Sequence, residues 1–553
     1  MSKRKKWTTV LVSMLIASLL VTACSRTEEQ ENTEKTQEPA TDTGDPFLGK
    51  YDPPIEVSTV RIIDSPKFVE GEDLDNNIWM RTISERLGIK VNNQWVVQAA
   101  QGTEKMNVTI ASGDLPDIFS VNASQFNQLV EAGEIMDLTE VYEKHASPLV
   151  KSFLDEATNS LASATFDGKL MGIPQPGGLV DAAPVLWIRK DWLDKLGLSE
   201  PKTMSDVLAI SEAFTTRDPD GNGQNDTTGL ALMKDLYGNY GSIDGFMNSY
   251  NAAPQSWVKA EDGTLVYGSI QPEMKAALAS LQDMYKNGQI DREFGVKDAL
   301  KAGELAASGK LGMTYGAFYI SLDQLKSSTA NDPNADWEPY PIFNEEGVAN
   351  PQIPALVVNG YHVVRKDAEH PEALLKMLNL YAEIQNDPVT PLDVKQAHWN
   401  ANGIQTWIYA PFLTGPASPN LGYHKKVVEA LNNKDETNLN SEEKIMYGYS
   451  LAMEEGTGTV DDWAYDKVFG RNSSYAVIDR YIQENLLKSG EFYGASTPTM
   501  AERMGTLKKM EIETFTKIIL GDPVDSFDKF VSDWKKLGGE QITQEVNEWY
   551  ISR

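Results

Sequence analysis

The chain has 553 residues, of which 41% are hydrophobic and 24% charged, and its formal net charge at pH 7 is −30. This length exceeds one ordinary hydrophobic core and predicts roughly two to four domains. The negative charge argues against nucleic acid as a partner, because phosphate binding needs a basic surface. It also argues against electrostatic attachment to anionic lipid.

The N-terminus has the pattern of a secretory signal peptide that ends at a cysteine. Residues 3–6 are basic, and residues 8–21 form an apolar run too short to span a bilayer. Leu20-Val21-Thr22-Ala23 then precede Cys24, the only cysteine, and resemble a bacterial lipobox. We therefore expect residues 1–23 to be a signal peptide and Cys24 to carry lipid such as palmitate. The mature chain can then form no internal disulfide.

Residues 24–50 comprise the predicted lipid-bearing Cys24 and the segment that follows it. They are rich in Glu, Thr and Pro and contain few apolar residues. This composition predicts a disordered tether. The folded part would then stand off the extracellular face of the cell membrane without a fixed orientation.

From residue 55 the sequence alternates strand-like and helix-like segments. Periodicity and β-branched content predict strand, helix, strand, helix and strand at residues 57–63, 76–87, 89–91, 103–112 and 117–121. This order favours an α/β domain with a largely parallel sheet. Ligands usually bind at the carboxyl ends of such strands, which selects Ser120 and Asn122.

A second unit begins near Ala182. It opens with a strand at 184–188 and a short helix capped by Asp191, and Thr203 or Ser205 caps the next helix. Further helices are expected at 272–287, 371–383 and 525–536, and further strands at 312–316, 356–358 and 362–364. Gly538 and Gly539 should stop the last helix. Apolar periodicity assigns three tryptophans to cores, namely Trp187, Trp192 and Trp534.

Several motifs occur in a characteristic order along the chain. They are SGDLPDI at 112–118, FDGKLMGIP at 166–174, LWIRKDWL at 186–193, GKLGM at 309–313, and WKKLGG with VNEWY at 534–539 and 546–550. Their order and spacing resemble the family 1 extracellular solute-binding proteins. With the lipobox, the likeness is greatest to the lipoprotein components of Gram-positive carbohydrate transporters, and it covers essentially all of the chain after the tether.

The resemblance implies an α/β fold of the two-lobed, type II-like periplasmic-binding-protein kind. Residues 51–175 and about 355–420 would form the first lobe. Residues 176–354 and about 421–553 would form the second, with hinge crossings after 173–174 and near Pro354. Such proteins close around a ligand held between the lobes and present it to the permease of an ABC importer. We expect a monomer.

The segment DPDGNGQND at residues 218–226 fits most of an EF-hand-like loop. An oxygen-only donor set favours Ca²⁺, and three close carboxylates repel one another unless a cation neutralises them. Gly229 stands where a bidentate glutamate is expected, so Thr227 or water would complete the shell. An Asx-rich turn without metal is the alternative. We expect a structural calcium ion held by Asp218, Asp220, Asn222, the Gln224 carbonyl, Asp226 and Thr227.

Aromatic side chains in polar, turn-rich surroundings are candidates for the ligand site, because sugars stack their C–H faces on rings. Any one of them could equally belong to a core. Tyr315 and Trp257 are the leading candidates. The others are Tyr237, Tyr240, Phe318, Tyr319, Tyr361, Trp399 and Trp407.

The sequence contains no recognisable catalytic motif. The five histidines, at 145, 362, 370, 398 and 424, lack metal-ligand spacing. A surface-anchored glycosidase stays open as the alternative, because its two carboxylates need only a spatial separation. An adhesin or structural lipoprotein is a further possibility. The favoured hypothesis is a membrane-anchored protein that binds an oligosaccharide for an ABC importer and is not an enzyme.

Overall fold

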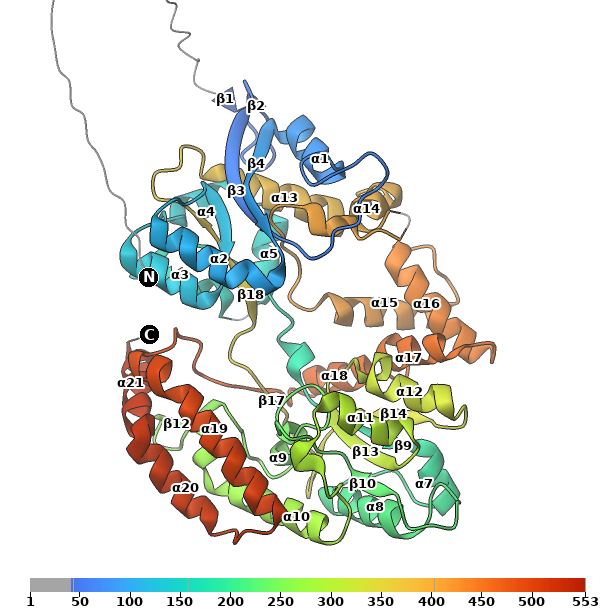
Figure 1. Cartoon of the computed structure of the whole chain (residues 1–553). Helices are drawn as coiled ribbons and strands as arrows, with labels where there is room; N and C mark the ends of the chain where they lie inside the picture. The colour runs from blue at the N-terminus through green and yellow to red at the C-terminus, as the bar shows by residue number, and fades with distance from the viewer. Residues whose placement is uncertain (1–40, 43, 158, 402, 553) are drawn as a thin grey trace, which may run out of the picture. The chain divides into compact units, whose positions relative to one another are not determined.

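The computed structural model describes residues 41–42, 44–157, 159–401 and 403–552 (Figure 1). The predicted signal peptide, Cys24 and most of the predicted tether lie outside these residues. Within them, no helix is both long enough and apolar enough to cross a membrane. The last residues of the predicted tether already contact the fold, since the Phe47 and Gly49 carbonyls accept hydrogen bonds from Asn379 (3.0 Å) and Lys376 (2.7 Å).

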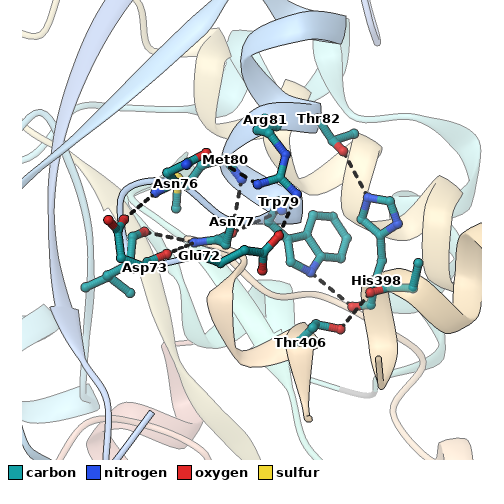
Figure 2. A network of polar contacts seen from close by, with 12 residues as sticks. Glu72, Asp73, Asn76, Asn77, Trp79, Met80, Arg81, Thr82, His398 and Thr406 are labelled. Carbon is teal, nitrogen blue, oxygen red and sulfur yellow. Dashed lines mark hydrogen bonds and ion pairs between the residues drawn. The ribbon is translucent and has the colours of Figure 1, made fainter. Parts of the chain in front are cut away.

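After a short antiparallel pair, β1 (Thr41–Asp42) and β2 (Tyr51–Asp52), the chain forms a parallel pair. β3 (Ile55–Ile62) pairs with β4 (Ile89–Val97), and α1 (Ile78–Leu87) connects them. Asn77 caps α1 by accepting hydrogen bonds from two backbone amides (Figure 2), and Gly88 ends the helix at φ 66°. A Cβ atom at Gly88 would lie 2.4 Å from the Tyr51 carbonyl oxygen, so the close approach of these two segments requires glycine.

A three-stranded antiparallel sheet lies beside this pair. It has β18 (Val358–Val364) in the centre, between β5 (Ile118–Val121) and β8 (Ile173–Pro176). The prediction of a largely parallel sheet is therefore wrong beyond β3 and β4, because the central strand arrives from much later in the chain. The strand predicted at 362–364 belongs to β18, which begins at Val358 with an irregularity between Val358 and Gly360; of the strand predicted at 356–358, residues 356 and 357 precede β18.

Helices surround these strands, and α13 (Glu372–Asn386) is nearly all buried. It contacts α1, α4 and α5. Pro371 is the N-cap of α13 and not its first helical residue. The other helices of this part are α2 (Ala99–Ser112), α3 (Ala123–Ala132), α4 (Thr139–His145), α5 (Pro148–Glu156), α6 (Ser160–Ser163) and α14 (Leu392–Trp399).

The second sheet has the strand order β10-β13-β9-β14. Its strands are β10 (Thr228–Leu230), β13 (Leu311–Gly316), β9 (Val185–Arg189) and β14 (Trp337–Tyr340), and only β10 and β13 are parallel. All residues of β9 and β13 are buried, which makes this sheet the centre of the larger core. Helices α7 (Lys190–Leu196), α8 (Met204–Thr216), α10 (Pro272–Lys286), α11 (Ala299–Ala307) and α12 (Gln324–Asn331) accompany it.

Two predicted helix caps have different outcomes. Thr203 caps α8 in a reciprocal capping box with Asp206, which confirms one of the two predicted residues. Asp191 does not cap α7; it lies inside the helix and accepts hydrogen bonds of 2.7 and 2.6 Å from Arg189. The Arg189 side chain is 2% exposed, and leaving its buried charge unpaired would cost more free energy than leaving the helix end without a side-chain cap.

The C-terminal part is helical. It comprises α15 (Pro419–Asn433), α16 (Ser441–Glu454), α17 (Val460–Phe469), α18 (Ser474–Gln483), α19 (Pro498–Leu520), α20 (Ser526–Trp534) and α21 (Glu540–Ile551). α19 packs on α10, and α19 to α21 follow one another in red in Figure 1. Gly538, at φ 127°, interrupts the helical path between α20 and α21. The core assignments of Trp187, Trp192 and Trp534 are confirmed, as all three are at most 2% exposed.

The chain passes between the two sheets more than once. β8 ends at Pro176 in the antiparallel sheet, and the next strand, β9, belongs to the four-stranded sheet. β18 then returns to the antiparallel sheet after β17 (Gln352–Ile353), which pairs with β19 (Lys488–Ser489). The fold is thus α/β with two lobes, each built on its own sheet.

Candidate ligand-binding site

Three adjoining cavities lie where the chain passes between the two sheets. Their volumes are about 290, 280 and 290 Å³. The first and second share Gln255, Ser256 and Pro354, and the second and third share Leu356, Tyr493 and Gly494. Because they share walls in this way, we treat them as one continuous row and call it the hinge trough.

Amides and carboxylates line the end of the hinge trough beside β9 and β13. They come from the crossing segments and from α9 (Asp244–Asn248) and the loops around it. Asn248 is held rigidly, since its Oδ1 accepts from the Gln352 amide and its Nδ2 donates to the Ala252 carbonyl, both at 2.9 Å. Side-chain amides of this kind pair well with sugar hydroxyls. The residues with amide or carboxylate side chains are Asn239, Asn248, Gln255, Gln352, Asp181 and Asp244.

The two carboxyl groups at this end are largely desolvated. Burial raises the pKa of Asp244 to about 6, against the opposing effect of the Ser242 hydroxyl. Burial also raises the pKa of Asp181, although the Tyr475 hydroxyl donates to it at 3.0 Å. A raised pKa keeps a carboxyl protonated, and so able to donate a hydrogen bond, up to a higher pH than usual.

Aromatic side chains line the middle of the hinge trough. Trp257 begins the hairpin of β11 (Trp257–Lys259) and β12 (Leu265–Tyr267), and Phe492 and Tyr493 follow β19. Both of the latter rings meet Trp549 of α21 edge-on, at 4.8 and 4.9 Å. Phe492 and Tyr493 were not predicted, although Gly490, Gly494 and Ser496 give them the polar, turn-rich surroundings that selected the other aromatic residues.

The third cavity reaches the first lobe. Tyr361 of β18 forms part of its wall, with Asn127 and Ser163. The Tyr361 ring stacks on Phe126 at 4.2 Å, and its hydroxyl lies 2.9 Å from Ser163 Oγ. The hinge trough therefore has walls from the sheets of both lobes.

The predicted ligand residues divide into three groups. Tyr315, Trp257 and Tyr361 line the first, second and third cavities, although each is at most 6% exposed. Trp399 and Trp407 line another cavity. Tyr237, Tyr240, Phe318, Tyr319 and Asn122 are not among the residues that line these cavities.

Four of these five side chains are buried in the fold, or bonded to or packed against other residues of it. The Tyr237 hydroxyl donates to buried Glu511 at 2.5 Å, and Tyr240 is fully buried. Phe318 packs against Tyr475, with ring centroids 4.8 Å apart. Asn122 forms the capping box of α3, where its side chain accepts from the Gln125 amide at 3.0 Å.

A further cavity, of about 300 Å³, lies among α13, α14, α15, α16, the short helix η5 (Thr406–Tyr409) and the end of β8, where Gln175 and Pro176 line it. We call it the tryptophan pocket. The rings of Trp399 and Trp407 stack within it, 5.6 Å apart and inclined by 22°. None of its lining residues belongs to the hinge trough.

The predicted calcium loop closes on itself through the side chain of Asp218. Its two carboxylate oxygens accept from the amides of Gly221, Asn222 and Gly223, each at 3.0 Å. The Asn222 side-chain nitrogen, Nδ2, donates to Asp220 Oδ2 at 2.7 Å and to Asp226 Oδ1 at 3.1 Å. The Asn222 side-chain oxygen accepts from the Gln224 backbone amide at 2.7 Å. Three carboxylates within nine residues are the kind of oxygen donors that Ca²⁺ prefers.

The carboxylates of the loop influence one another. The hydrogen bond between their side chains lowers the pKa of Asp218, whereas burial and then that bond raise the pKa of Asp220. Lys310 pairs with Asp226 at 3.0 Å and offsets part of the charge. Thr227 donates to the Phe214 carbonyl at 2.7 Å, toward α8. No set of three His, Cys, Asp or Glu side chains in the described ranges is arranged as a metal site.

The fold has two lobes, each on its own sheet, and a polar and aromatic trough where the chain crosses between them. This arrangement is that of a solute-binding protein. The model of the bacterial extracellular solute-binding protein family matches residues 83–386. This is more than half of the chain, and the chain belongs to that family. Because the family binds solutes, the protein is a binding component and not an enzyme, which sets the glycosidase alternative aside.

Similar proteins cover nearly the whole chain. This chain is 23% identical to Lipoprotein LipO of Bacillus subtilis (strain 168), and the match covers 99% of each of the two chains. It is 27% identical to the polygalacturonan/rhamnogalacturonan-binding protein YtcQ of the same organism, over 85% of this chain and 87% of YtcQ. Its fold resembles that of the S. pneumoniae ABC-transporter substrate-binding protein FusA, as an EF-hand mutant in complex with fructo-nystose. The TM-score is 0.55 at 16% identity, over 90% of this chain and 99% of that one.

Proposed function

We propose that the protein is the membrane-anchored substrate-binding component of an ABC importer and captures an oligosaccharide in the hinge trough. The observation that carries this proposal is the composition of the trough. It joins rigid aromatic walls around Trp257 and Tyr493 to fixed amides such as Asn248. Rings suit the C–H faces of sugars, and amides suit their hydroxyls. The sugar-binding names of YtcQ and FusA agree with this ligand class.

The ligand is, we infer, an uncharged oligosaccharide. Among the described residues that line the hinge trough there is no lysine, arginine or histidine, and the two ionisable carboxyls are Asp181 and Asp244. A uronate carboxylate bound there would be desolvated beside like charges without a cation to offset it. In this respect the chain differs from what the name of YtcQ would suggest.

Calcium is proposed as a brace within the second lobe. Asp218, Asp220, Asn222 and Asp226 would supply side-chain oxygens, and Gln224 its carbonyl, between the end of α8 and β10. The EF-hand named for FusA and the converging oxygens of this loop support the assignment. The ion would neutralise the close carboxylates and take no part in ligand contact, since the loop does not line the hinge trough.

The remaining elements of the proposal concern anchoring and assembly. Cys24 would carry the lipid, as the lipobox pattern and the name of Lipoprotein LipO suggest. The first lobe would comprise residues 51–175 and about 355–420, and the second residues 176–354 and about 421–553. The monomer would close around the sugar and deliver it to the permease.

Thermal melting of the full-length chain in detergent tests the ligand class. A ligand that binds only the native state at a hundred times its Kd stabilises it by about 2.7 kcal/mol. We expect the melting midpoint to rise with one class among uncharged hexose, pentose and fructose oligomers. Tyr493→Ala should remove that rise, whereas Tyr449→Ala, a control at a tyrosine outside the trough, should keep it. An unchanged midpoint with every uncharged sugar, or a rise that survives in Tyr493→Ala, contradicts the proposal.

A further inference from the structure

The sequence motif VNEWY, at residues 546–550, lies on α21. Two of its side chains, Asn547 and Trp549, contact the segments that carry the aromatic walls of the hinge trough. Neither is among the described residues that line the trough. We propose that Asn547 and Trp549 are positioning residues, which hold the aromatic walls in place and thereby set the affinity of the trough for its ligand. This role rests on the sugar-binding function proposed for the trough.

Trp549 packs against one aromatic wall. The rings of Phe492 and Tyr493 both meet it edge-on, at centroid distances of 4.8 and 4.9 Å and interplanar angles of 74° and 86°. Edge-to-face contact at this distance is a favoured arrangement of aromatic rings, and it restricts the orientation of each ring. One indole outside the trough therefore holds two rings that line it.

The backbone next to these rings packs closely on the same tryptophan. A Cβ atom at Gly494 would lie 2.7 Å from Trp549 Nε1 and 2.9 Å from Phe492 Cε2, so this approach requires glycine. On the other side of the rings, the Glu491 amide donates to the Trp257 carbonyl at 2.9 Å. The two rings thus lie between a backbone bond to the hairpin of β11 and β12 and a close contact with α21.

Asn547 holds the hairpin that begins at Trp257. Its Oδ1 accepts from the Leu265 amide and its Nδ2 donates to the Leu265 carbonyl, both at 2.8 Å. Nδ2 also donates to the Thr543 carbonyl, one turn earlier in α21, at 2.8 Å. Because the side-chain amide pairs with both backbone groups of one residue, it fixes the edge of the hairpin relative to the helix.

The ring of Trp257 has further support from the helix before α21. It packs on Tyr267 across the hairpin, with centroids 5.3 Å apart, and Tyr267 stacks on Trp534 of α20 at 5.0 Å and 7°. Both aromatic walls thus rest on the C-terminal helices. A surface that is already fixed loses little conformational entropy when a ligand binds, so its affinity depends on the residues that fix it.

Isothermal titration calorimetry of the full-length chain in detergent tests this role. The probes are maltotriose, cellotriose, xylotriose and kestose, and each variant is measured at a temperature where circular dichroism shows it to be folded. For the sugar that binds the wild type, Trp549→Ala should raise the Kd about ten-fold. Trp549→Phe keeps an aromatic ring and should retain most of the affinity. Asn547→Ala should raise the Kd by a smaller factor.

Glu548→Ala is the matched control, because Glu548 is exposed on the same helix, and it should keep the wild-type Kd. A merely structural role of α21 would lower the melting midpoint of Trp549→Ala and leave the Kd of the folded protein unchanged. The inference alone is overturned if Trp549→Ala binds with the wild-type Kd, or if Asn547→Ala does so should Trp549→Ala not fold. If none of the four sugars binds the wild type, the proposed function of the trough is overturned together with this inference.

Discussion

Replacing Glu511 by glutamine should change how the stability of the protein depends on pH. Glu511 lies on α19 and has no exposed surface. Its Oε1 accepts from the Tyr237 hydroxyl at 2.5 Å and from the Ser269 hydroxyl at 3.0 Å. The Tyr267 hydroxyl donates to Oε2 at 3.4 Å. Burial outweighs these bonds and raises the pKa of Glu511 from 4.5 to about 7.

The size and sign of the effect follow from this pKa. Below pH 4.5 the carboxyl is protonated in both the native and the unfolded state, and it causes no pH dependence. Between pH 4.5 and about 7 the unfolded state loses the proton that the native state keeps, so the free energy of unfolding falls as pH rises. At about 1.4 kcal/mol per pH unit, the total loss is about 3 kcal/mol. Glutamine cannot ionise and should not show this loss.

Denaturant unfolding of the wild-type chain and of Glu511→Gln at pH 5, 6, 7 and 8 measures the difference. The stability of the variant relative to wild type should rise by about 2–3 kcal/mol across this range. Glu513→Gln serves as a control on the same helix, because the Glu513 side chain is 55% exposed. A difference between wild type and Glu511→Gln that stays constant from pH 5 to 8 would refute the reasoning.

The other predictions concern ligand charge, calcium, a histidine and a glycine. Trigalacturonate should raise the melting midpoint far less than its methyl ester, which has the same stereochemistry without charge; equal shifts would contradict an uncharged ligand. EDTA should lower the midpoint of the wild-type chain but not that of Asp218→Ala, and an unchanged wild-type midpoint would rule out the calcium brace. Burial lowers the pKa of His362 from 6.5 to about 4. As pH falls from 6.5 to 4, the free energy of unfolding of the wild type, measured with denaturant, should therefore fall by up to about 3 kcal/mol relative to that of His362→Gln. Gly88→Ala should lower the free energy of unfolding by about 2 kcal/mol or more in the same assay, because the backbone there is left-handed and the new Cβ would meet Tyr51. Gly113→Ala is the control and should lower it less, because Gly113 is also left-handed but has open space around it.

Local sequence determined much of the secondary structure. Helix α1 ends at Gly88 as predicted, although it begins at Ile78 and not at residue 76, and Thr203, one of the two predicted residues, caps α8. Capping depends on residues within one turn. The core positions of Trp187 and Trp534 likewise follow from apolar periodicity. Such features need no distant partner.

Only the tertiary structure decided the arrangement of the first sheet and of the cavities. Strand β18 runs antiparallel between β5 and β8. Pairing between strands far apart in the sequence leaves no local pattern, so the sequence alone did not reveal it. Asp191 serves the buried Arg189 and not a helix end, since burial of a charge outweighs a local cap preference.

The candidate sites show the same division. Aromatic residues in polar surroundings could be selected from the sequence, and Trp257, Trp399 and Trp407 do line cavities. Phe492 and Tyr493 meet the same criterion but were not selected, and only the fold shows that their loop lies beside the hairpin that begins at Trp257. Composition specifies which side chains are suited to a sugar, and the packing of distant segments decides which of them share a cavity.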